Sequence, residues 1–130
     1  FSWPQKCQNI PNDCFRECDC LEQIEGIEEV TDIGYGAFRS SAIKKFLWPA
    51  GVSAAETSEF LGGCEHLEEI FFEGTGIKTV DLEKFFSSKN IKKIDLSGCS
   101  AVNLINCSSP EGRELRDKVV LPPYYVTEIN

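Results

Sequence analysis

A four-residue pattern that recurs every 22 to 24 residues constrains the fold of this chain more than any other feature. Each copy reads apolar-polar-polar-apolar, and the copies are Leu21–Ile24, Ile43–Phe46, Leu67–Ile70 and Ile91–Ile94. One segment of this length has an apolar face and too little chain to cover it. Stacked segments cover one another, so the fixed period predicts a solenoid of repeats.

A second block has the same internal spacing as the first. Its copies are Cys7–Ile10, Val30–Ile33, Val52–Ala55, Ile77–Val80, Val102–Ile105 and Val126–Ile129. A phenylalanine follows the block by five residues in four cases, at Phe15, Phe38, Phe60 and Phe85. We expect these rings to plug the wall opposite the sheet, from a short helix or a 3₁₀ turn.

A third block reads as a short strand. Its copies are Phe46–Pro49 and Val119–Pro122, with Phe1–Pro4, Ile70–Phe72 and Ile94–Leu96 in the same slot, whereas Ile24–Gly26 fits poorly. Strand alternation places Phe46 and Trp48 inward, and successive strands are expected to pair in parallel, about 4.8 Å apart.

These blocks predict an α/β repeat solenoid of the leucine-rich-repeat type. A parallel β-sheet lines its concave face, with short helices, 3₁₀ turns and loops on the other side. Residues 1–130 are expected to form a single solenoid of about five coils, a fragment or processed part of a longer array. The last coil departs from the pattern, because Pro110 stands in the phenylalanine slot and Pro110–Lys118 reads as a short polar helix.

Two strings, Ile33–Phe38 and Phe60–Ile70, resemble the BspA-like class of leucine-rich repeats, whose form is I-G-x-x-A-F-x-x-C-x-x-L-x-x-I-x-I-P. The resemblance covers nearly the whole chain. It implies a surface or secreted protein of the kind that bacteria and protists use in adhesion and protein binding. The last coil and the crowded cysteines depart from the family pattern.

Charge and hydropathy exclude two classes of partner. The net charge of −8 disfavours nucleic acid, because phosphate backbones would repel such a surface. No apolar run approaches the roughly 18 residues that span a bilayer, so membrane insertion is not expected.

The seven cysteines are read through the repeat. Cys18 and Cys64 share one small-residue slot, with Ser40 and Ser88 as the expected equivalents, and are predicted to be buried thiols. Cys7 is placed in an apolar slot. A disulfide between Cys99 and Cys107, or one near the N-terminus, stays open. No zinc-like C-x2-C pair occurs, so neither a metal nor a cofactor is predicted.

The candidate catalytic side chains lack the neighbouring groups that catalysis would require. His66 is the only histidine and stands near Cys64, but no third group can be named to orient it. Neighbouring carboxylates, such as Glu28 and Glu29, lack a cleft that would separate their pKa values. We therefore predict that the chain is not an enzyme.

The candidate site is a partner-binding patch on the outer face of the sheet. Leu47 and Phe71 should be adjacent outward residues at strand centres, with Lys45, Glu69, Glu73, Lys93 and Asp95 as a polar rim. The alternative is a pair of scattered surface apolar groups or a contact with a neighbouring domain. Charges in the first block alternate in sign from coil to coil, as Glu22, Lys44, Glu68 and Lys92 illustrate. This alternation suits a register-fixing ladder, a recognition surface, or both.

Together these features predict a non-catalytic, secreted or cell-surface module for protein binding or adhesion. The alternative is a structural spacer or self-assembling scaffold that associates end to end.

Overall fold

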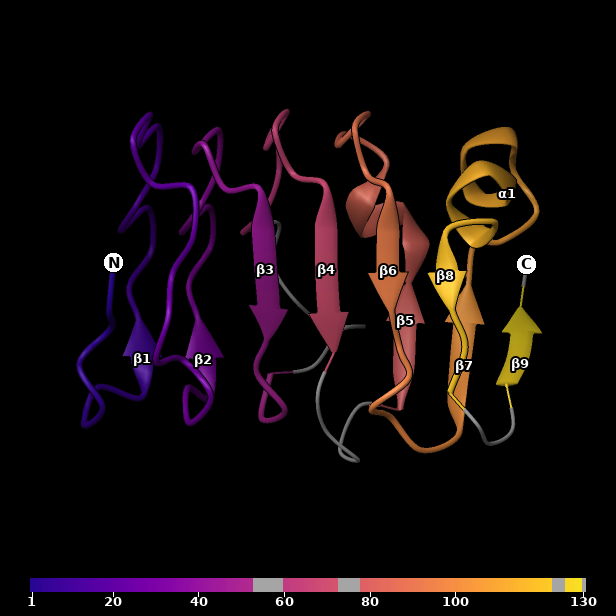
Figure 1. Cartoon of the computed structure of the whole chain (residues 1–130), viewed down its shortest axis with the longest axis horizontal. Coiled ribbons are helices and arrows are strands. Elements are labelled where there is room, and N and C mark those ends of the chain that lie inside the picture. Colours follow the sequence, from indigo (N-terminus) through magenta and orange to yellow (C-terminus); the bar gives the residue numbers. More distant parts are fainter. Residues whose placement is uncertain (53–59, 73–77, 123–125, 130) are drawn as a thin grey trace.

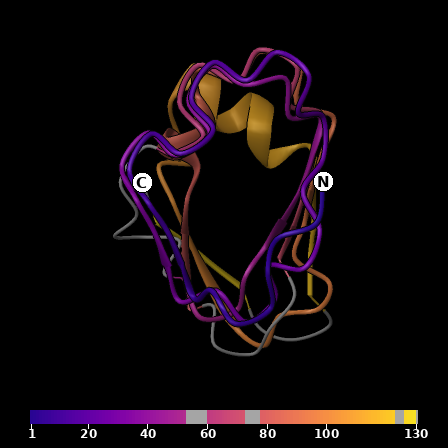
Figure 2. The same ribbon diagram turned by 90° about the vertical axis from the view of Figure 1, so that its left-hand side faces the viewer.

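Successive repeats stack as coils of a parallel β-solenoid, as the period predicted. The computed structural model describes residues 1–52, 60–72, 78–122 and 126–129. The main sheet has the order β3-β4-β6-β8, with β3 at Lys45–Trp48, β4 at Glu69–Phe72, β6 at Lys93–Asp95 and β8 at Val119–Val120. Figure 1 shows these strands side by side, and in the axial view of Figure 2 the coils nearly superimpose. The count of about five coils stays a prediction.

The strands of the main sheet pair without slippage from one repeat to the next. Phe46 is opposite Ile70, and Ile70 is opposite Ile94. All three are fully buried, as are their neighbours two residues on, Trp48 and Phe72. The predicted inward set is therefore confirmed, because a parallel register repeats the same face in every coil.

The opposite wall contains more strand than the sequence indicated. The second block forms β1 (Asn9–Ile10) with β2 (Asp32–Ile33), and β5 (Thr79–Asp81) with β7 (Val102–Ile105) and β9 (Val126–Ile129), all in parallel. Within the described ranges, the only 3₁₀ helix is η1 (Leu82–Phe85), which places Phe85 in the core. The other phenylalanines of that slot are held by turns. Phe38 and Phe60 are buried and Phe15 is half-buried.

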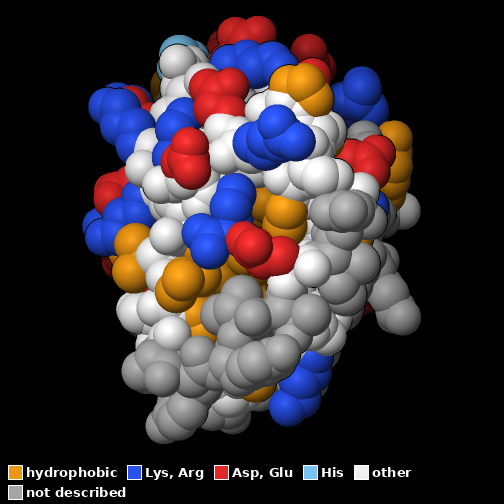
Figure 3. All heavy atoms as spheres, turned by 90° about the vertical axis from the view of Figure 1, so that its right-hand side faces the viewer, with side chains coloured by type: hydrophobic (Ala, Val, Ile, Leu, Met, Phe, Trp, Pro, Cys, Tyr) orange, Lys and Arg blue, Asp and Glu red, His pale blue; other side chains and the backbone are white. Residues whose placement is uncertain are grey.

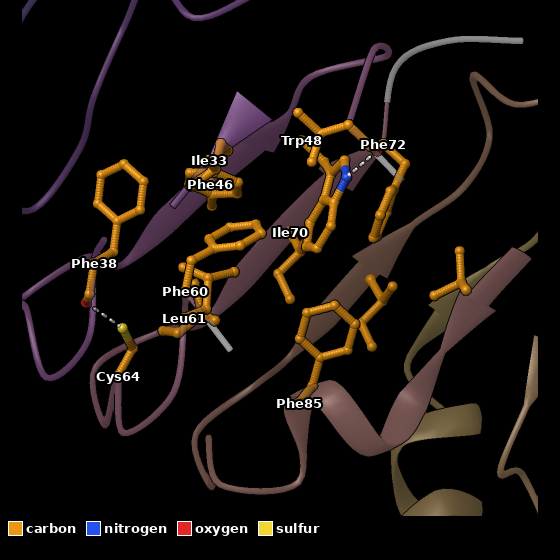
Figure 4. Close-up of a cluster of buried hydrophobic side chains, with 14 of the residues drawn as sticks. Ile33, Phe38, Phe46, Trp48, Phe60, Leu61, Cys64, Ile70, Phe72 and Phe85 are labelled. Atoms are coloured by element: carbon orange, nitrogen blue, oxygen red, sulfur yellow. Dashed lines mark hydrogen bonds between the residues drawn. The ribbon is translucent and has the colours of Figure 1, made fainter. Parts of the chain in front are cut away.

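Aromatic rings link the coils through the core (Figure 4). Phe15 stacks on Phe38 with centroids 5.3 Å apart, and Trp48 stacks on Phe72 at 4.9 Å. The Trp48 indole N–H donates to the carbonyl of Val52 at 2.8 Å. The core is continuous, because each ring contacts rings of the neighbouring coils.

The predicted helix in the last repeat is confirmed as α1 (Pro110–Arg116). Ser109 caps it by accepting a hydrogen bond from the Gly112 N–H at 3.0 Å, and Pro110 occupies the first turn, where no backbone donor is needed. Figure 2 shows α1 within the outline of the coils. Its buried Leu115 joins the core, so the helix covers the apolar end of the stack.

Candidate functional site

The outward row of the main sheet brings two predicted site residues together. Leu47 is opposite Phe71, and the row continues through Asp95 to Val120. Leu47 and Phe71 are half-buried, because neighbouring side chains cover part of each. The expected adjacency of this apolar pair on the sheet face is confirmed.

Two lysines flank the ring of Phe71. The Nζ atoms of Lys45 on β3 and Lys93 on β6 each lie 5.1 Å from the ring centroid. An ammonium group at this distance is attracted by the negative face of the ring. The Lys93 ammonium also lies 3.8 Å from the Asp95 carboxylate. Phe71 is therefore held between two cations rather than standing as an isolated surface ring.

The predicted charge ladder forms at one of its two positions. The Nζ atoms of Lys44 and Lys92 each lie 3.5 Å from a carboxylate oxygen of the preceding coil, on Glu22 and Glu68 respectively. At the second position of the ladder, the side chains of Lys45 and Lys93 extend toward the ring of Phe71 instead. Ladder and apolar patch therefore use neighbouring rows of the same sheet.

Asp95 lies at one end of the patch, where hydrogen bonds fix its carboxylate. Its Oδ1 accepts hydrogen bonds from the Ser97 N–H at 2.8 Å and from the Ser97 hydroxyl at 2.6 Å. Burial by itself raises the pKa of the Asp95 carboxyl. The Ser97 bonds and the Lys93 ammonium together outweigh it, so the pKa lies below its usual value.

A hollow of about 320 Å³ opens beside the apolar pair. We call it the sheet-face hollow; one wall is residues 23–28, and the other is Lys45, Leu47 and Phe71. A smaller hollow of about 170 Å³ adjoins it, shares Glu28 and Leu47, and reaches Pro49 and Ala50. The lower limit for small-ligand sites is of similar size.

The hollow exists because the sheet is interrupted between the second coil and β3. The Lys44 N–H donates to the Glu22 carbonyl at 2.9 Å. Beyond that bond, no backbone hydrogen bond joins 23–28 to β3 within the described ranges. Glu25 pairs instead with Ser2 of the first coil. Gly26 has φ +81, a left-handed conformation that ends the strand and accounts for the poor fit of Ile24–Gly26.

The predicted site residues divide into three groups. Leu47, Phe71 and Lys45 line the hollow, Glu69, Lys93 and Asp95 lie on the adjoining strands, and Glu73 lies outside the described residues. The wall formed by Gln23, Glu25 and Glu28 was missed. The signal that could have revealed it was the strand-breaking Gly26 beside an outward Glu25.

The model of the BspA type leucine-rich repeat region matches residues 1–108 in six copies. The chain belongs to this family. No curated protein and no solved structure matches the chain. Leucine-rich repeats commonly act as protein-interaction modules and are generally non-catalytic. BspA-type repeats often come from bacterial surface proteins.

The repeat register corrects one assignment of a small residue in this BspA-type chain. Ser41, not Ser40, is the equivalent of Cys64: Ser41 is buried and its hydroxyl lies 3.8 Å from the Cys64 Sγ. Ser40 is exposed with φ +57 and corresponds to Gly63, whose φ is +69. The prediction was wrong because Ile43 follows the small-residue slot by two residues, whereas Leu67 follows it by three.

The cysteines are buried to different extents. Cys64 is buried, as predicted, and donates its thiol to the Phe38 carbonyl at 3.0 Å. Cys18 is only half-buried, so its predicted burial is wrong, and Cys7 is exposed although it stands in an apolar slot of the pattern. They lie in the terminal coil of the described structure, which packs against one other coil there. Cys99 donates its thiol to the Phe72 carbonyl at 3.5 Å, so it is not bridged to Cys107.

Burial also governs the chemistry of these thiols. Desolvation by burial raises the pKa of the Cys64 thiol. The pKa of the Cys99 thiol is raised mainly by desolvation and to a smaller extent by the negative charge of nearby Asp95. His66 is exposed, as expected of a solvated side chain. Among the described residues, no group of three His, Cys, Asp or Glu could hold a metal ion, and no helix is long and apolar enough to cross a membrane.

Proposed function

We propose that this chain is a non-catalytic protein-binding module whose contact surface is the sheet-face hollow and its rim. The observation that supports this best is the half-buried pair Leu47 and Phe71 at the border of the hollow. Interfaces are centred on aromatic or aliphatic anchors surrounded by polar groups. Here Lys45, Glu69, Lys93 and Asp95 provide that surround.

The module is proposed to work outside the cell, as a secreted or cell-surface adhesion protein. The frequent occurrence of BspA-type repeats in bacterial surface proteins supports this setting. The excess of 21 acidic over 13 basic residues also favours a protein partner over a nucleic acid.

A peptide-display selection tests the contact surface. Binders selected on the wild-type chain are expected to lose binding to the double variant Leu47→Glu, Phe71→Glu, because two charges would enter the apolar centre. The matched control is Tyr35→Glu, which places a charge on another exposed apolar side chain, away from the hollow. Binders that bind all three proteins equally would refute the assignment of the surface, provided that circular dichroism shows each variant folded.

A second proposal is self-association through the end of the solenoid that β8 borders. Val120 and Leu121 there are 40% and 41% exposed. Figure 3 shows hydrophobic side chains among charged ones at this end. Light scattering is expected to show a mass that rises with concentration for the wild type and not for Val120→Glu. A constant monomer mass for the wild type would contradict it.

A further inference from the structure

We propose that the sheet-face hollow receives an extended, basic peptide segment of the partner, which adds to the open edge of β3 and places an arginine or lysine against Glu25 and Glu28. This inference rests on the proposed function and specifies the chemistry of its partner. It follows from the backbone of β3, the charges of the opposite wall and the apolar pair between them.

The backbone supports strand addition. Outward residues of this sheet bond to the preceding coil: the Glu25 N–H donates to Phe1, and the Val120 carbonyl accepts from Leu96. By the same alternation, the N–H and carbonyl of Leu47 face residues 24–26, where the ladder is interrupted. An extended segment supplies the missing acceptor and donor, as in β-augmentation.

The charges of the wall select a basic guest. Glu25 and Glu28 are exposed, and neither forms an ion pair with any described residue. The undescribed segments hold no lysine, arginine or histidine that could pair with them. The nearest lysine of the hollow, Lys45, extends toward β4 and lies over the ring of Phe71. With two carboxylates, Glu25 and Glu28, against the single ammonium of Lys45, the lining has a net negative charge, which suits a cationic side chain.

The apolar pair Leu47 and Phe71 explains why the bound peptide segment is expected to alternate apolar and basic residues. Leu47 and Phe71 are adjacent on one face of the sheet, so a strand beside β3 would present every second side chain to that face. An apolar side chain there contacts Leu47. A neighbouring arginine or lysine packs its aliphatic stem along the apolar surface and reaches the carboxylates with its charged end.

NMR titrations of the full chain with three blocked pentapeptides test this inference. The probes are acetyl-Val-Arg-Val-Arg-Val-amide, its counterpart with glutamate in place of arginine, and an N-methylated form that lacks main-chain donors. The arginine peptide is expected to shift the amide signals of Gly26, Leu47 and Phe71. Binding should weaken about ten-fold with Glu25→Lys, Glu28→Lys, which reverses two exposed charges. The control Asp19→Lys, Glu65→Lys also reverses two exposed charges, at sites away from the hollow, and should have little effect.

Each other outcome overturns a defined part of the proposal. Equal binding of the arginine and glutamate peptides would remove the charge preference, and equal binding of the N-methylated form would remove strand addition. Shifts at Leu47 that grow with protein concentration alone would identify a second copy of the chain as the occupant. If no peptide binds while display-selected binders still require Leu47 and Phe71, this inference fails and the proposed function stands.

Discussion

The chain contains the same tryptophan motif twice, in two different degrees of burial. Trp3 and Trp48 both precede a proline, and each indole N–H donates to the carbonyl four residues later, on Cys7 at 2.7 Å and on Val52 at 2.8 Å. Trp48 is 2% exposed, whereas Trp3 is half-buried and Cys7 is exposed. Replacement of each tryptophan by phenylalanine therefore removes the same hydrogen bond in two environments.

The expected costs differ because only one of the two carbonyls can turn to water. Trp48→Phe leaves the carbonyl of the buried Val52 without its donor, at about 1–3 kcal/mol. It also loses ring contacts with Phe60 and Phe72, both at 4.9 Å, which brings the total to roughly 2–4 kcal/mol. For Trp3→Phe, water replaces the indole, so the cost should be about 0.5–1 kcal/mol.

Urea unfolding followed by far-ultraviolet circular dichroism measures this difference. With a urea slope of about 2 kcal/mol/M, Trp48→Phe should lower the midpoint by roughly 1–2 M and Trp3→Phe by a few tenths of 1 M. Equal midpoint shifts, with unchanged slopes, would refute the view that burial of the accepting carbonyl sets the cost.

Three further predictions follow from close contacts and burial. Gly112→Ala should destabilise the chain by about 2 kcal/mol or more in urea unfolding, although alanine favours helix, because the new Cβ would lie 2.0 Å from the Asn106 carbonyl oxygen; stabilisation would contradict this. Since the fold lowers the pKa of Asp95, its contribution to stability is present above the unfolded-state value and is lost as pH falls through the folded-state value. The urea midpoints of wild type and Asp95→Asn should therefore converge below about pH 4, and a gap that persists there would contradict the assignment. In alkylation followed by mass spectrometry, the exposed Cys20 should react in the native protein and the buried Cys64 only after unfolding, and early labelling of Cys64 would place it outside the core.

The candidate site shows which features of the structure could be predicted from the sequence. The adjacency of Leu47 and Phe71 followed from the period, because equal spacing in sequence becomes a straight row when strands pair in register. The hollow beside them did not follow, because it depends on a hydrogen-bond ladder that ends after Glu22 and Lys44. A pattern of apolar positions carries no information on which backbone groups remain unpaired.

The positions of the long lysine side chains could not be predicted from the sequence either. The first block predicted opposite charges at neighbouring positions, and Lys44 and Lys92 do lie close to glutamates of the preceding coil. Lys45 and Lys93 have the same spacing, yet both extend toward Phe71. Each long side chain has several partners within reach, so its position depends on the three-dimensional surroundings of the ammonium group rather than on sequence spacing.

The sequence by itself determined the architecture of this protein: a leucine-rich-repeat solenoid with Phe46, Trp48 and Ile70 inward and Leu47 and Phe71 outward. Periodicity suffices for this, since a repeat that cannot bury its own apolar face must stack on its neighbours. Only the tertiary structure decided where the sheet breaks and that Cys18, unlike Cys64, is half-buried. Those features depend on backbone pairing and on the cover that adjacent coils provide, and neither is local to the residues concerned.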